Sequence, residues 1–230
     1  MHDAAHRRLT ILEGIAAAAK LSRRSPDDVQ LIAVSKGRTA DEIEALIAAG
    51  QKDFGENRVQ EALDKWPSLL SRFPEVRLHE IGRLQSNKVA DALSVFSTIH
   101  SVDRPSLVEP LSKAESGAAA DVYVQVNIGD EPQKGGCALA DVGDMVGRVR
   151  SAGLNLLGLM AIPPLDCEPS PYFALLANLA RRHGLHGLSM GMSSDYRQAV
   201  MMGATAVRVG SALIDQCYSR CPLRRRFVAR

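Results

Sequence analysis

Short apolar runs alternate with amphipathic segments along most of the chain. The segment VQLIAVSK (29–36) is almost continuously apolar, which is typical of a parallel strand covered on both faces. The segment TADEIEALIAAG (39–50) has helical spacing. Thr39 and Glu42 can form a capping box at its start, and Gly50 can end it. The pattern therefore predicts one strand followed by one helix.

Seven further strands follow in the same order, and a predicted helix follows each of the first six. The predicted strands cover 52–57, 77–82, 98–103, 121–128, 155–164, 186–193 and 206–214. The predicted helices lie within 59–73, 86–96, the segment opened by Pro105, 142–149, 172–184 and 194–204. We expect Pro67 to end or kink the helix in which it lies, because proline lacks the N–H group that a helix interior needs.

Eight strands that alternate with helices over short connections predict a single (β/α)8 TIM barrel. An open, doubly wound sheet is the alternative, but the first strand–helix turn, SKGRT, lacks a Gly-rich dinucleotide fingerprint. We expect residues 1–214 to form the barrel with an extra N-terminal helix, in which Leu9, Leu12, Ile15 and Ala16 recur on one face. Residues 215–230 are expected to form a basic, partly disordered tail.

The composition is that of an ordinary globular protein, with 46% hydrophobic and 23% charged residues among 230. No apolar run approaches the roughly 18 residues that span a bilayer. Glu13 interrupts the apolar N-terminal stretch, which favours an amphipathic helix over a signal peptide and a cytoplasmic location. The four cysteines (Cys137, Cys167, Cys217 and Cys221) form no CxxC motif, so we expect free thiols and no metal site.

The formal net charge of +2 comes from the end of the chain. Residues 215–230 contain five arginines and one aspartate, which leaves 23 basic and 25 acidic residues elsewhere. The run Arg224–Arg226 could contact nucleic acid or a membrane, but a solvated tail is the simpler interpretation. We therefore expect neither nucleic acid nor membrane as a partner.

Polar residues follow the apolar strands at the end where TIM barrels carry their function. Lys36 ends the first predicted strand, where a partly desolvated amine could attack an aldehyde. The alternative is a lysine that only extends to solvent. Near the seventh helix start, Ser193 could favour an anion, and Gly210 and Ser211 add open backbone and a hydroxyl. Helix capping is the alternative for Ser193.

An amine on the first strand and a phosphate site on the last two describe a pocket for a phosphorylated aldehyde. Pyridoxal 5′-phosphate is the common cofactor of that kind. The chain also resembles the pyridoxal phosphate homeostasis protein family, whose barrel is similar to the N-terminal domain of alanine racemase. The matching stretches are LIAVSKGRT, DFGENRVQEALDKW, HEIGRLQSNKV, IHSVDR, VNIGDEPQKGG, GLMAIPP and LSMGMSSDYRQAVMMGATAVRVGSALI, in family order across 29–214.

The resemblance implies roles for six residues. Lys36 would carry the cofactor as a Schiff base, and Asn57 would lie beside the ring oxygen. Arg208 would face the pyridine nitrogen; an ion pair at the barrel rim is the alternative for it. Because an arginine cannot take a proton from that nitrogen, the ring would be a poorer electron sink than one paired with a carboxylate.

The phosphate would be bound by Ser193, Gly210 and Ser211, which completes the implied set. Some positions depart from the family pattern. Arg58 stands where a tyrosine follows GEN, and Glu80 replaces an aromatic residue. Gly37–Arg38–Thr39 replaces a Lys-Thr-Lys-like run, Ser211 replaces a threonine, and the chain after Leu213 has no family counterpart.

The resemblance implies a monomeric protein of vitamin B6 homeostasis that buffers pyridoxal phosphate and delivers it to apo-enzymes, with little or no catalysis. The first alternative is an amino-acid racemase of the alanine racemase type. The second is a protein that acts through its arginine-rich tail, with the barrel as a scaffold.

Overall fold

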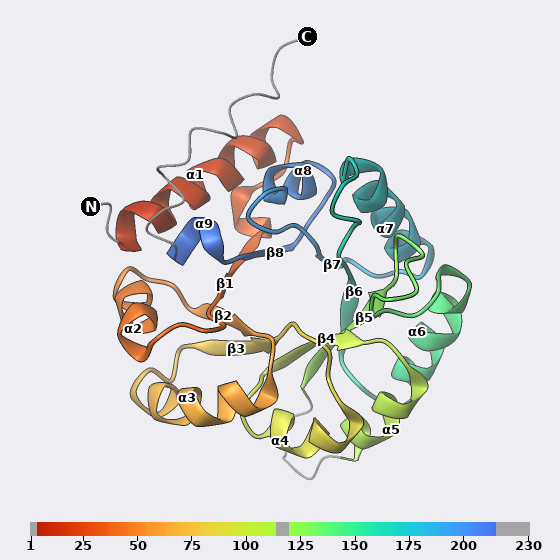
Figure 1. Cartoon of the computed structure of the whole chain (residues 1–230). Helices are drawn as coiled ribbons and strands as arrows, with labels where there is room; N and C mark the ends of the chain where they lie inside the picture. Colours follow the sequence, from red (N-terminus) through yellow and green to blue (C-terminus); the bar gives the residue numbers. More distant parts are fainter. Residues whose placement is uncertain (1–3, 114–119, 215–230) are drawn as a thin grey trace.

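The computed structural model describes residues 4–113 and 120–214, and in these the eight predicted strands close into one barrel (Figure 1). Every neighbouring pair is parallel, including β1 with β8. The strands are β1 Gln30–Val34, β2 Asp53–Glu56, β3 Arg77–Glu80, β4 Thr98–Val102, β5 Asp121–Val126, β6 Leu156–Ala161, β7 Gly187–Ser189 and β8 Ala206–Val209. The predicted (β/α)8 barrel is therefore confirmed.

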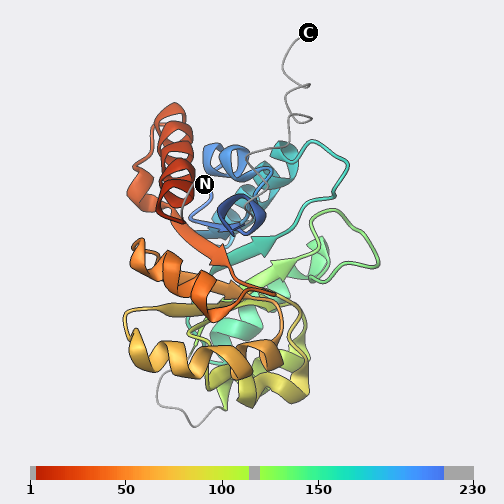
Figure 2. The same ribbon diagram turned by 60° about the vertical axis from the view of Figure 1, so that its left-hand side comes forward.

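A helix follows each strand, and the helices form a ring around the barrel (Figures 1 and 2). They are α2 Ala40–Ala48, α3 Val59–Arg72, α4 Val89–Leu93, α5 Pro105–Ser112, α6 Val142–Ser151, α7 Ser170–Arg182, α8 Tyr196–Met201 and α9 Ser211–Ile214. Short 3-10 turns at Pro26–Asp28, Ser86–Lys88 and Leu139–Asp141 precede β1, α4 and α6. Within the described ranges, no helix combines the length and apolar character needed to cross a membrane.

The extra N-terminal helix, α1 Ala4–Leu21, lies outside β8 and β1 (Figure 1). Its buried face differs from the predicted one, because Leu9 is 53% exposed. The side chains that it buries are small or branched: Ile11, Ile15, Ala18 and Ala19. A Cβ atom on Gly14 would collide with the hydroxyl of Tyr196 on α8. The close approach of α1 and α8 therefore selects a face of small residues.

The ends of α2 are the ones that its sequence predicts. Thr39 Oγ1 accepts a hydrogen bond from the backbone N–H of Glu42 at 3.3 Å, and the Glu42 carboxylate accepts the N–H of Thr39 at 3.0 Å. Gly50, just after the helix, has φ = +88°, in the region that glycine tolerates best. The capping box and the glycine stop are confirmed.

Pro67 lies inside α3, which continues to Arg72. Of the two outcomes expected for Pro67, an end or a kink of the helix, the end is therefore wrong. Trp66 and Leu69, on either side of the proline, are both buried against the barrel. Their packing holds the helix together across the single hydrogen bond that proline removes.

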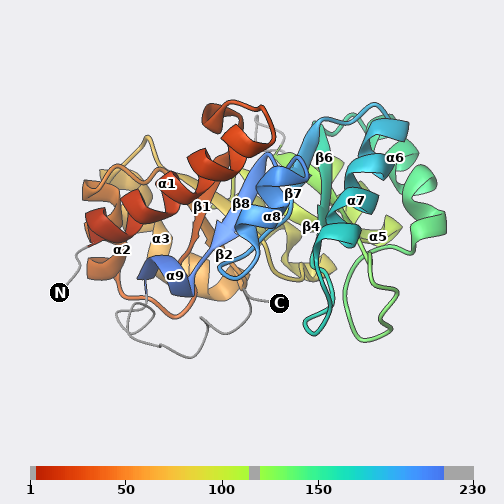
Figure 3. The same ribbon diagram turned by 90° about the horizontal axis from the view of Figure 1, so that it is seen from above.

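The last two strands are shorter than predicted. β7 ends at Ser189, so Ser193 lies in the following loop, and β8 ends at Val209, so Ser211 opens α9. In Figure 3, α9 and the long loops after β5 and β6 extend from the same end of the barrel. This carboxyl end of the strands carries the candidate site. The predicted tail, residues 215–230, lies outside the described residues.

Candidate functional site

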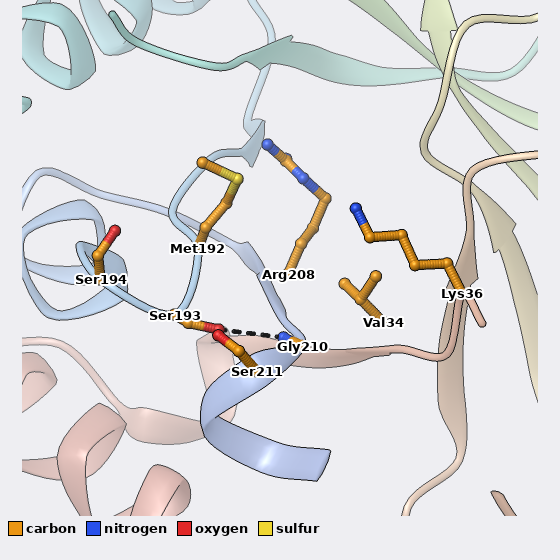
Figure 4. Close-up of a pocket in the computed structure, with 8 residues that line it drawn as sticks. All are labelled: Val34, Lys36, Met192, Ser193, Ser194, Arg208, Gly210 and Ser211. Carbon is orange, nitrogen blue, oxygen red and sulfur yellow. Dashed lines mark hydrogen bonds between the residues drawn. The ribbon is translucent and has the colours of Figure 1, made fainter. Parts of the chain in front are cut away.

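A cavity of about 360 Å³ opens at the carboxyl end of β1, β7 and β8 (Figure 4). Its size is within the range of small-molecule sites. It is lined by Val34, Lys36, Met192, Ser193, Ser194, Arg208, Gly210 and Ser211. The structure thus brings together five of the six residues that the sequence singled out, and Asn57 is the one outside this wall.

Lys36 reaches the cavity from the turn after β1. Gly37 follows it with φ = +66°, which lets the chain turn sharply away from the strand. The Lys36 side chain extends toward Arg208 (Figure 4), and its amine has no hydrogen-bond or ion-pair partner among the described residues. Lys36 is exposed, however, whereas we expected a partly desolvated amine. The open mouth of the cavity accounts for this difference.

A buried carboxylate fixes the backbone that carries Lys36. Glu56, fully buried at the end of β2, has an Oε1 atom that accepts bonds from the Ser35 hydroxyl at 2.8 Å and the Trp66 indole at 3.0 Å. Lys65 Nζ lies 2.7 Å from the same oxygen and donates to the Ser35 carbonyl at 2.9 Å. Both the side chain and the backbone carbonyl of Ser35 are hydrogen-bonded. The backbone just before Lys36 is therefore fixed, while the Lys36 amine has no partner.

Two serine hydroxyls lie at the β7–β8 side of the cavity. Ser193 Oγ accepts a hydrogen bond from the backbone N–H of Gly210 at 3.2 Å (Figure 4) and another from that of Ala212 at 3.3 Å. Since both bonds use its lone pairs, its proton can be donated to a ligand. The Ser211 hydroxyl lies beside it and has no partner within the described part of the chain. This pair can donate two hydrogen bonds to an anion.

The start of α8 carries an acidic residue beside the expected anion site. Asp195 is the N-cap residue, and its Oδ1 atom accepts the backbone N–H of Met192 at 2.6 Å. Burial raises the pKa of Asp195, although the bond from Met192 acts in the opposite direction. The Asp195 side chain makes no hydrogen bond to the first turn of α8, so the anion-binding role expected for this helix start stays a prediction beside that of the serine pair.

Arg208 is the buried cation of the cavity, with only 3% of its surface exposed. Its Nη1 donates to Ser189 Oγ at 2.5 Å and its Nη2 to the Ala161 carbonyl at 3.1 Å. Burial lowers the pKa of Arg208 to about 10, so the guanidinium stays charged at neutral pH. The suggested ion pair at the barrel rim is absent among the described residues, where no carboxylate comes within salt-bridge distance of this guanidinium. The cation therefore faces the cavity from inside the barrel.

Asn57 follows β2 and is half-buried. Its Oδ1 atom is buried and accepts no hydrogen bond from any described residue. A Cβ atom on Gly82 would collide with the Asn57 carbonyl, so β2 and β3 lie very close together here. The buried, unpaired oxygen is compatible with the ligand-binding role expected for Asn57, which does not line the cavity wall.

Sequence reasoning missed Val34 and Met192, which form the apolar part of the wall. It also missed Ser189 and His100, which lie behind Arg208. The sequence did contain a signal for His100. It is a polar residue in the middle of the apolar strand TIHSV (β4), which indicates a polar contact inside the barrel.

Comparison with known proteins places this geometry in a family. A model of the alanine racemase N-terminal domain matches residues 15–215. The Escherichia coli K12 protein named pyridoxal phosphate homeostasis protein is 36% identical, over 93% of this chain and 96% of the relative. A Pseudomonas aeruginosa protein of the same name is 40% identical, over 85% of this chain and 88% of that protein.

Solved structures agree with this. The protein PipY of Synechococcus elongatus, with PLP bound, is 38% identical and has a TM-score of 0.72, covering 87% of this chain and 99% of that one. A Bifidobacterium adolescentis protein of unknown function is 32% identical with a TM-score of 0.83, covering 91% and 94% of the two chains. The chain belongs to the pyridoxal phosphate homeostasis protein family, whose barrel is that of the alanine racemase N-terminal domain.

Proposed function

We propose that this protein binds pyridoxal 5′-phosphate as a Schiff base on Lys36 and serves to buffer the cofactor and deliver it to apo-enzymes. The observation that carries the proposal is the unpartnered Lys36 amine, which shares one cavity with the Ser193–Ser211 hydroxyl pair. An amine and a phosphate site together suit a phosphorylated aldehyde. The relatives that bear the homeostasis name, and PipY with its bound PLP, support the same ligand.

The residues present fit the chemistry of this ligand. Lys36 would hold the aldehyde carbon through Nζ, since a free amine can form a Schiff base with an aldehyde and release water. Ser193 and Ser211 donate hydrogen bonds to the phosphate, and the Gly210 backbone keeps that end of the cavity open. The Arg208 guanidinium would face the ring nitrogen, and its charge would disfavour protonation of that nitrogen. When bound, the cofactor supplies an electron sink, and Arg208 weakens that property.

Little or no catalysis is the second part of the proposal. Racemisation needs an acid/base group on each face of the reacting carbon. Among the described residues, the cavity wall offers Lys36 but no second side chain that can act as a base, since Arg208 is cationic and the others are serines or apolar residues. Tyr123 and Tyr196 are buried elsewhere, and neither they nor Tyr172 lines the cavity. An amino-acid racemase on this barrel is the alternative.

The remaining parts of the proposal concern the protein in the cell. We propose a monomer in the cytoplasm that hands its cofactor to apo-enzymes directly, with neither nucleic acid nor membrane as a partner. The arginine-rich tail would then be dispensable. Deleting the residues after Ile214 should leave cofactor binding unchanged, and loss of a protein partner with the tail would favour the alternative in which the tail carries the function.

The proposed function is tested by adding pyridoxal phosphate to the purified protein and recording its absorbance. The protein should develop a Schiff-base band, and Lys36→Ala should not, while both variants keep the same thermal unfolding midpoint. Lys52→Ala, which removes an exposed lysine at the other end of the barrel, is the control and should retain the band. A full band in Lys36→Ala would refute the attachment to Lys36.

A further inference from the structure

Arg208 is one end of a string of hydrogen bonds that crosses the barrel interior. Ser189 Oγ, which accepts the bond from Arg208, lies 2.8 Å from His100 Nδ1. His100 Nε2 lies 3.0 Å from His79 Nδ1, and His79 Nε2 lies 3.3 Å from Asp53 Oδ1. Since β4 and β7 are not neighbours in the barrel, the contact between His100 and Ser189 must run through its interior.

The two ends of this string determine the direction of every hydrogen bond in it. A guanidinium can only donate, and an ionised carboxylate can only accept. If both imidazoles are neutral, Ser189 donates to His100 Nδ1, His100 donates from Nε2 to His79 Nδ1, and His79 donates from Nε2 to Asp53. All four bonds then point from the cation toward the carboxylate, an arrangement in which each bond strengthens the next.

The surroundings hold both imidazoles in this arrangement. His79 and His100 are 3% and 0% exposed. The His100 ring stacks on Tyr123, with ring centres 4.5 Å apart and planes 21° apart. Burial lowers the pKa of His100 well below its usual range, and the charge of Arg208 acts in the same direction. A neutral, immobile His100 is what the ordered string requires.

A buried guanidinium that lacks a carboxylate partner is costly. The acid that acts electrostatically on Arg208 is Asp195, whose charge opposes the lowering of the Arg208 pKa by burial. Asp53 lies at the opposite end of the barrel, where its side chain is 13% exposed and also pairs with Arg77 at 2.8 Å. The hydrogen bonds connect Arg208 to Asp53 through the interior without placing an acid in the cavity. A carboxylate in contact with Arg208 would compete for the guanidinium, whereas Ser189 leaves it directed at the cavity.

We propose that Ser189, His100, His79 and Asp53 form a positioning relay, which holds the Arg208 guanidinium toward the ring nitrogen of bound pyridoxal phosphate. The relay rests on the proposed function for its ligand, but its hydrogen-bond order is a property of the protein alone.

The first test uses the full chain without cofactor, labelled with 15N in its histidines. Long-range proton–nitrogen correlation spectra at neutral pH report which ring nitrogen carries the proton. Both His79 and His100 should be neutral and protonated at Nε2. Asp53→Asn, which keeps an acceptor oxygen, should preserve this pattern at His79, and Asp53→Ala should not. An Nδ1 proton on His100, or a doubly protonated His79, would overturn the relay.

The second test measures cofactor binding in variants of the relay. Ser189→Ala removes the acceptor of Arg208 and should weaken binding about tenfold and shift the absorbance maximum of the bound cofactor. Ser101→Ala is the matched control, because it removes an equally buried serine hydroxyl from β4 that bonds to Glu80 and not to the relay. Asp53→Ala changes the partly exposed end of the relay and should shift the absorbance maximum in the same direction. It therefore provides the test if Ser189→Ala folds poorly.

The two failures are distinguishable. Variants at Ser189 and Asp53 that match the native protein in affinity and absorbance, while the native protein binds normally, would overturn the relay alone. A native protein that forms no Schiff-base band would refute the proposed function, whatever the histidine spectra show.

Discussion

At the scale of single residues, the site separates an exposed amine from a buried cation. Lys36 is free of partners in an open cavity mouth, and Arg208 is 3% exposed and anchored by two hydrogen bonds. An amine that must form and release a covalent bond benefits from access to solvent. A guanidinium that orients a ring benefits from fixed partners. Each environment therefore suits the role that we propose for the residue.

The serine hydroxyls give a prediction about the anion. Ser193→Ala and Ser211→Ala should each weaken pyridoxal phosphate binding by about 1–2 kcal/mol, the scale for a hydrogen bond to a charged group. Ser68→Ala, at an exposed position on α3, should have no effect. Pyridoxal, which lacks the phosphate, should bind far less well in the same titration. Equal affinities for pyridoxal and its phosphate would show that the serine pair does not hold the anion.

Glu80 gives a prediction about stability and pH. It is 1% exposed, Ser101 donates to its Oε2 atom at 2.6 Å, and its Oε1 atom has no partner in the described ranges. Burial raises the pKa of Glu80 to about 8, from 4.5 for an ordinary glutamate. The folded state binds this proton more tightly than the unfolded state. Its stabilising effect is therefore complete below pH 4.5 and is lost as the pH rises through about 8.

The corresponding experiment is urea unfolding between pH 5 and pH 9. Each pKa unit is worth about 1.4 kcal/mol, so native stability should fall by a few kcal/mol across this range. Glu80→Gln cannot ionise and should remove most of that slope, which makes it more stable than the native protein at pH 9. Glu13→Gln, exposed on α1, should keep the native slope. An unchanged slope in Glu80→Gln would show that another group causes the loss.

At the scale of elements, the order of strands and helices was predictable because hydrophobic period and capping signals are local. The capping box at Thr39 and the buried face of α6 are examples. The residues at which β7 and β8 end were not predictable, because they depend on contacts between segments distant in sequence. One example is the hydrogen bond that the Gly210 N–H donates to Ser193 Oγ. The same limit applies to the site. Motifs identified Lys36 and Arg208, but the contacts behind Arg208 join strands far apart in sequence.

The junction of β1, β2 and α3 gives a prediction at this scale. Lys65→Met would leave the Glu56 carboxylate buried without its cation, which should cost about 3 kcal/mol of unfolding free energy. Lys113→Met removes an exposed lysine paired with Glu109, where both side chains are 72% exposed, and should leave the unfolding free energy nearly unchanged. Urea unfolding distinguishes the two values. Similar small losses in both variants would mean that the buried pair does not stabilise this junction.

At the scale of the whole molecule, the barrel shares its architecture with a racemase domain but offers one candidate base in the described cavity wall. We expect alanine racemisation to be very slow or absent. The assay follows α-proton exchange and optical inversion of alanine in deuterated water, with a racemase as the positive control. Turnover near the usual enzyme scale of about 1–1000 per second, lost in Lys36→Ala, would favour the racemase alternative.

The central claim is that Lys36 holds pyridoxal phosphate covalently, and chemical trapping tests it most directly. The protein loaded with pyridoxal phosphate is treated with borohydride, digested and mapped by mass spectrometry. Reduction should bleach the absorbance band and leave one stoichiometric phosphopyridoxyl group on the peptide that contains Lys36. The label should be absent from that site in Lys36→Ala and retained in Lys52→Ala. A stoichiometric label on another lysine of the native protein, with Lys36 unmodified, would contradict the account.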